Sequence, residues 1–77
     1  MIEAEAWQEW IGCVADALGE APEAVDVAAI HALGREVARG FTRPMAPVSA
    51  YLWGLAVASH PETDPGELRD RILTCLP

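Results

Sequence analysis

The chain is short of positive charge. It has no lysine, and its five basic residues are all arginines, set against twelve carboxylates, which gives a net charge of −7. Binding to a nucleic-acid backbone needs clustered positive charge, and an anionic membrane surface repels an acidic chain. Nucleic acid and membrane are therefore not expected as partners, whereas a basic surface on another protein would attract this chain.

Residues that build reactive sites are also few and scattered. The chain has two cysteines, Cys13 and Cys75, and two histidines, His31 and His60, none at the spacing of a metal site. Neither these residues nor Ser49 belongs to a recognisable nucleophile motif. We therefore predict no enzyme, no cofactor and no metal.

The cysteines also bear on the compartment. They lie far apart in the sequence, and no charged segment with a following apolar run marks a secretory signal. We expect a cytoplasmic protein with two buried thiols, and a Cys13–Cys75 bridge is the alternative if their helices are neighbours. No uncharged run reaches the ~20 residues that a membrane span needs.

The most apolar stretch, residues 45–59, carries no charge. Pro47 suits a first helical turn, so we predict a buried central helix from Pro47 to about Ser59. Such a helix needs encirclement or a partner, and Trp53 is the tryptophan we expect to face that partner. Its other faces carry a small strip (Ala46, Ala50, Gly54, Ala58) and a bulky ridge (Val48, Leu52, Leu55).

Apolar spacing and end signals predict two helices before this one. The first spans about residues 2–18 and ends at Gly19, and the second spans about residues 27–39. Asp26 is the expected N-terminal cap of the second helix, and Gly40 its C-terminal cap. The expected inward face of the second helix carries Val27, Ile30, Leu33, Gly34 and Val37.

A fourth helix follows a capping box at Asp64-Pro65-Gly66-Glu67 and runs to about Cys75. No strand-like alternation and no repeat interrupts this pattern. The sequence therefore predicts one all-α domain over residues 1–77, a compact bundle of four short helices.

Positive charge is concentrated on one predicted helix face, which we call the basic stripe. His31, Arg35 and Arg39 are four residues apart, and Arg43 follows just beyond the helix end. Guanidinium groups bind oxyanions in a bidentate manner, so the stripe could hold a phosphate, a carboxylate or an acidic patch of a partner. A solvated helix face without a ligand explains the same spacing and is the more ordinary interpretation.

A sharper motif is Arg43-Pro44-Met45-Ala46-Pro47, followed by an apolar helix with Gly54 inside it. Here the chain resembles a family of short actinobacterial helical proteins known only as a domain of unknown function, and the resemblance covers nearly the whole chain. Family members occur beside, or fused to, molybdenum-cofactor guanylyltransferases and formate dehydrogenase accessory proteins. The resemblance implies an accessory role near cofactor maturation. A buried structural Arg43 and a ligand-binding Arg43 both suit the motif.

These observations lead to one main hypothesis and two alternatives. The main one is a non-catalytic accessory module that docks on a protein of molybdenum cofactor biosynthesis or molybdoenzyme maturation. The alternatives are a small domain that binds an anion or nucleotide phosphate through the stripe, and a homodimer built on the third helix. The residues expected to bind are the basic stripe with Pro44, Pro47 and Trp53.

Overall fold

The computed structural model describes residues 3–77, with side chains from Glu5 onward, and every regular element in that range is helical. The prediction of a compact all-α fold with four short helices is confirmed. The predicted first helical residue, Ile2, lies outside the described residues. The elements are α1 (Glu3–Leu18), the 3-10 turn η1 (Pro22–Ala24), α2 (Val27–Gly40), α3 (Met45–Ser59) and α4 (Pro65–Leu73).

Local signals end and begin the helices as predicted. Gly19 adopts φ +72° after α1, a conformation that costs glycine little. The Asp26 carboxylate accepts a hydrogen bond of 3.0 Å from the Ala29 N–H at the start of α2. Asp64 accepts one of 3.3 Å from the Glu67 N–H at the start of α4. Both acidic caps are confirmed.

Gly40 has a different role from the predicted one. It is the last residue of α2, and the C-terminal cap is Phe41, whose N–H donates to the Val37 carbonyl. A β-carbon at position 40 would lie 2.9 Å from Leu76 Cδ1. Gly40 therefore makes room for the C-terminal segment to pack against α2, and the prediction that it caps the helix is wrong.

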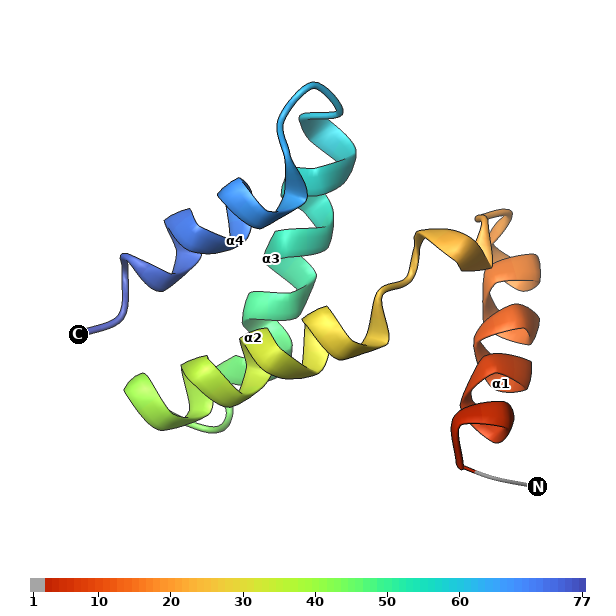
Figure 1. The fold of residues 1–77 in the computed structure, drawn as a ribbon, viewed down its shortest axis with the longest axis horizontal. Coiled ribbons are helices and arrows are strands. Elements are labelled where there is room, and N and C mark those ends of the chain that lie inside the picture. The colour runs from red at the N-terminus through yellow and green to blue at the C-terminus, as the bar shows by residue number, and fades with distance from the viewer. Residues whose placement is uncertain (1–2) are drawn as a thin grey trace.

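Helices α2, α3 and α4 pack together, and we call them the three-helix unit. Figure 1 shows α3 rising from the crossing with α2, and α4 descending beside it. A β-carbon at Gly34 would lie 3.8 Å from Ala46 Cβ, so α2 and α3 approach each other closely at this point. The core of the unit consists of Leu33, Val37, Trp53 and Leu68, of which Leu33 is fully buried.

The burial of Trp53 reverses our expectation. Its side chain is only 8% exposed, whereas Trp7 and Trp10 are 42% and 68% exposed. The Trp53 Nε1–H donates a 2.8 Å hydrogen bond to the Pro65 carbonyl, so the ring is inserted where α4 begins. The prediction that Trp53 faces a partner is wrong because α4 folds back over that side of α3.

Helix α1 lies to one side of the three-helix unit, and residues 19–21 connect it to η1 (Figure 1). An aromatic contact joins it to α2, since the Trp7 and His31 rings meet edge to face with centroids 5.6 Å apart. Both cysteines are free and exposed, Cys13 on α1 and Cys75 in a turn after α4. The prediction of buried thiols is therefore wrong, and the alternative bridge is not formed.

Candidate functional site

One side of α3 is covered by α2 and α4, and the other side is open. We call the open side the outer face. Its residues recur three and four positions apart, so they form one continuous strip along the helix. Each is a large apolar or aromatic side chain, and the exposed fractions run from 37% to 70%. The outer face consists of Met45, Val48, Tyr51, Leu52 and Leu55.

Contacts on the covered side fix the rotation of α3. The Ser49 hydroxyl is buried and donates a 2.6 Å hydrogen bond to the Ala46 carbonyl. Trp53, one turn further along, is held by the Pro65 carbonyl. Because Ser49 and Trp53 both point into the three-helix unit, Leu52 and its neighbours must point away from it.

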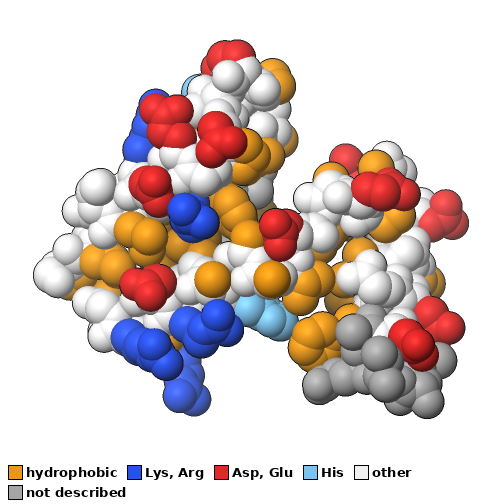
Figure 2. Space-filling view, in the orientation of Figure 1, with side chains coloured by type: hydrophobic (Ala, Val, Ile, Leu, Met, Phe, Trp, Pro, Cys, Tyr) orange, Lys and Arg blue, Asp and Glu red, His pale blue; other side chains and the backbone are white. Residues whose placement is uncertain are grey.

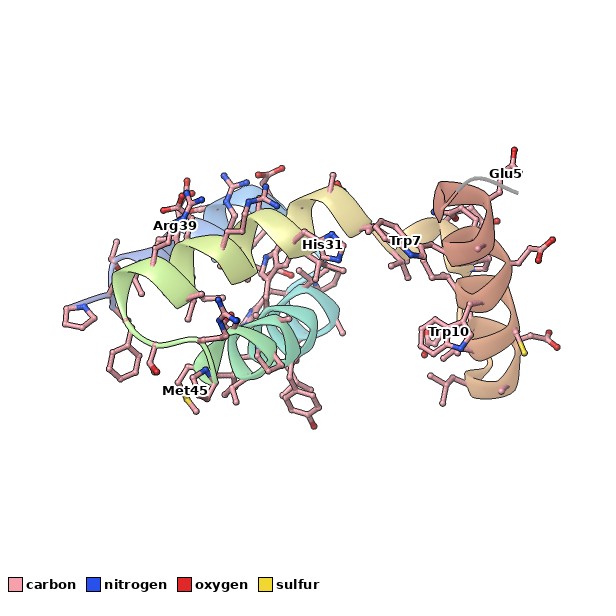
Figure 3. All side chains as sticks on the ribbon, turned by 90° about the horizontal axis from the view of Figure 1, so that it is seen from below. Glu5, Trp7, Trp10, His31, Arg39 and Met45 are labelled. Carbon is pink, nitrogen blue, oxygen red and sulfur yellow. The ribbon has the colours of Figure 1, made fainter. Side chains whose placement is uncertain are left out.

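The two prolines of the predicted motif set the start of α3. Pro44 is the N-cap residue, and Pro47 lies in the first turn, where a missing N–H leaves no helical hydrogen bond unmade. Both side chains are exposed at the same end of the helix as Met45. Of the basic stripe, Arg43 adjoins the outer face, because it precedes Met45 by two residues, whereas Figure 3 shows Arg39 and Met45 on opposite sides of the α2–α3 pair.

The basic stripe follows α2, and its arginines are exposed. Figure 2 shows blue arginine side chains gathered along one edge of α2. Within residues 5–77, the arginine ion pairs are Arg69–Asp70 and Arg71–Glu67, so none involves the stripe. Arg43 is exposed two residues before Met45, and the interpretation as a buried structural arginine is wrong. The guanidinium groups are thus open to oxyanions, and that of Arg43 lies near one end of the outer face.

His31 differs from the three arginines of the stripe. Its ring contacts Trp7 across the boundary between α1 and α2. Figure 3 shows Trp7 pointing from α1 toward His31, with Arg39 further along α2. The structure therefore divides the predicted stripe into a histidine that faces α1 and arginines that face solvent.

Other chemistry is sparse in the described part of the chain. Among residues 5–77, no three histidine, cysteine or carboxylate side chains gather closely enough to suggest a metal site. No helix among the described residues is both long and apolar enough to cross a membrane. The site therefore offers apolar contact along α3, with one guanidinium group, that of Arg43, near its N-terminal end.

Sequence reasoning missed Met45 and Tyr51 as members of the exposed surface. It placed Leu52 on a bulky ridge but gave no reason for that ridge to be uncovered. Tyr51 carried a usable signal, because a phenol suits a surface that is apolar at its centre and wet at its edge. Position 51 adjoins positions 48 and 55 on a helix, which would have marked the open side.

A family model described as "Domain of unknown function (DUF6457)" matches residues 2–75. The chain belongs to this family. The DUF6457 match includes all four helices, the outer face and the basic stripe, and it confirms that the predicted resemblance is to a domain of unknown function. The actinobacterial origin, the molybdenum-related neighbours and the proline motif as a family signature stay predictions. No curated protein and no solved structure matches the chain.

Proposed function

We propose that this DUF6457 protein is a non-catalytic accessory module that acts by docking on a protein of molybdenum cofactor biosynthesis or molybdoenzyme maturation. The observation that carries the docking role is the outer face of α3. Single exposed apolar side chains are normal on a monomer, but a contiguous set with a polar rim is typical of a protein-binding surface. The link to molybdenum cofactor rests on the resemblance of the Arg43–Pro47 motif.

The chemistry of the partner follows from the border of this surface. Arg43 lies two residues before Met45, at the start of the outer face, whereas Arg39 lies on the far side of α2 from Met45 (Figure 3). Neither arginine pairs with a carboxylate of residues 5–77. A partner surface with an apolar centre and an acidic rim would complement both parts. Leu52 and Leu55 would supply the buried contact, and Arg43 would set orientation and association rate.

The non-catalytic part of the proposal rests on the sequence and on Ser49. No nucleophile and base are paired at a motif spacing, and the Ser49 hydroxyl is used to bond the Ala46 carbonyl. A buried hydroxyl in that bond serves helix geometry. Recognition is therefore the better supported activity.

The test is co-purification with two baits from the same organism, a molybdenum-cofactor guanylyltransferase and a formate dehydrogenase accessory protein. We expect one bait to retain the wild-type protein and to lose the Leu52→Asp variant. Phe41→Asp is the matched control, since Phe41 is also exposed but belongs to the loop after α2. Circular dichroism should show the same helix content for all three proteins. Failure of both baits to retain wild type would contradict the proposal.

A second candidate function is anion binding by the basic stripe, and the absence of ion pairs at its arginines within residues 5–77 favours it. A nucleotide phosphate is the expected ligand class, bound by Arg35, Arg39 and Arg43. Calorimetric titration with GTP should give heat with wild type and a weaker signal with Arg43→Ala. No heat with wild type would remove this candidate.

A further inference from the structure

A cleft separates α1 from the three-helix unit. Trp7 and Trp10 of α1 form one wall, and Val27 and Ile30 of α2 form the floor. A second hollow of about 750 Å³ shares Ile30 with this one and runs along the side of α3 that carries Gly54, and we treat the two hollows together as the cleft. Figure 2 shows the surface hollowed between α1 and the rest, and Figure 3 shows Trp10 directed into that space. The walls are mainly apolar, so the cleft exposes apolar side chains against which another segment could pack.

Helix α1 has little packing of its own. Trp10 and Leu18 are large apolar residues of α1, and their side chains are 68% and 70% exposed. Among the described side chains, the aromatic contact between α1 and α2 is the edge-to-face packing of Trp7 on His31. Helices of this length owe most of their stability to packing of an apolar face. The three-helix unit of the same chain therefore buries the apolar side chains of α1 only in part.

The accessible surface gives the size of that deficit. The chain exposes 5734 Å², whereas a folded monomer of 8.3 kDa is expected to expose roughly 4,600 Å². The excess of about 1,100 Å² exceeds the ~800 Å² that each partner buries in a standard interface. The excess is therefore large enough to form one side of a standard dimer interface.

The distribution of charge along the chain favours a second copy as the occupant. Residues 1–26 contain seven carboxylates and no arginine, whereas residues 27–59 contain three arginines and one carboxylate. An acidic α1 is thus attracted to the α2–α3 segment of another copy, whose Arg35 lines a hollow beside the cleft, and is repelled by another α1. Each chain carries both complementary parts, as a two-fold symmetric interface requires.

We propose that the cleft is the dimer interface of this protein, and that α1 of a second copy enters it reciprocally. Trp10 of each chain then packs against the α3 wall around Gly54 of the other. Gly54 suits such an approach, because a β-carbon there would meet nothing within 4 Å. This interface is distinct from the outer face of α3. The dimer proposal can therefore be tested separately from the proposed docking function.

The test is the mass in solution, measured by light scattering after size exclusion over a range of concentrations. Wild type should have twice the 8.3 kDa chain mass. Trp10→Asp should halve the measured mass, and so should Gly54→Leu, which fills the opposite wall. Both positions are exposed, so circular dichroism should show that the helices are retained.

Two matched variants separate this interface from others. Leu52→Asp changes the outer face and Phe41→Asp changes the loop after α2, and both should stay dimeric. A wild-type mass of 8.3 kDa at every concentration would overturn the proposal. A dimer that survives Trp10→Asp but is lost with Leu52→Asp would also overturn it, because the interface would then be the outer face.

Discussion

Leu52 and Trp53 are neighbours on α3, and their surroundings are opposite. Trp53 is 8% exposed and hydrogen-bonded to the Pro65 carbonyl, whereas Leu52 is 53% exposed. Both are large apolar residues in a helix without any charge. Hydrophobicity alone therefore does not decide which side of this helix is buried. The decision comes from the segments that pack on it, α2 on one flank and α4 on the other.

The comparison also separates stability from recognition. Side chains on the covered side of α3 join Leu33, Val37 and Leu68 in one core. Side chains on the outer face contribute little to that core and are available to a partner. Substitutions on the two sides should therefore differ in their effect on the free energy of unfolding, even when the chemical change is the same.

The largest effect is expected from Leu33→Ala. Leu33 is fully buried between α2 and α3, so truncation should leave a cavity and lower the free energy of unfolding by about 2–5 kcal/mol. For a domain of this size that is a large share of total stability. Urea unfolding followed by far-ultraviolet circular dichroism would measure it. A loss below ~1 kcal/mol would mean that the core is not packed as described.

A smaller loss is expected from Trp53→Phe. The ring stays apolar, but the Pro65 carbonyl loses its Nε1–H donor, which should cost about 1–3 kcal/mol. Tyr51→Phe is the control, because Tyr51 is 70% exposed and lies outside the proposed dimer cleft, and it should change stability by less than ~0.5 kcal/mol. Equal losses at the two positions would contradict the contrast between the covered side and the outer face of α3.

The features that the sequence predicted well are those with local causes. Gly19, Asp26 and Asp64 act on backbone groups within a few residues, so their roles need no knowledge of the rest of the fold. The inward face of α2 was also predicted, because Arg35 and Glu36 interrupt its apolar residues and mark the solvent side.

Features that depend on where distant segments lie were predicted poorly. In α3 no charged residue marks a solvent side. The periodicity therefore led us to expect Trp53 to face a partner, and it did not identify the outer face as exposed. The exposure of Cys13 likewise depends on how α1 lies against the three-helix unit. The proximity of Arg43 to the apolar surface was implicit in the sequence, since it precedes Met45 by two residues, but the openness of that surface was not.

Removing the N-terminal cap of α2 should have an intermediate effect on the free energy of unfolding. Asp26→Ala removes the acceptor for the Ala29 N–H and should destabilise the protein by about 1 kcal/mol. Asp26→Asn keeps an acceptor oxygen and should recover most of that loss. Thermal unfolding of the three proteins would measure both steps. An Asn variant as unstable as the Ala variant would show that charge, not the hydrogen bond, is the stabilising feature.

The smallest effect is expected from Leu52→Ala. It is the same chemical change as Leu33→Ala, but Leu33 of α2 belongs to the core on the covered side of α3, whereas Leu52 lies on the outer face. Leu52 is 53% exposed, so little packing is lost, and alanine has the higher helix propensity. The free energy of unfolding should change by no more than ~0.5 kcal/mol. Binding to a docking partner should nevertheless weaken, because Leu52 lies in the middle of the outer face. A stability loss comparable to that of Leu33→Ala would mean that the outer face is covered within the protein itself, and the docking role would lose its support.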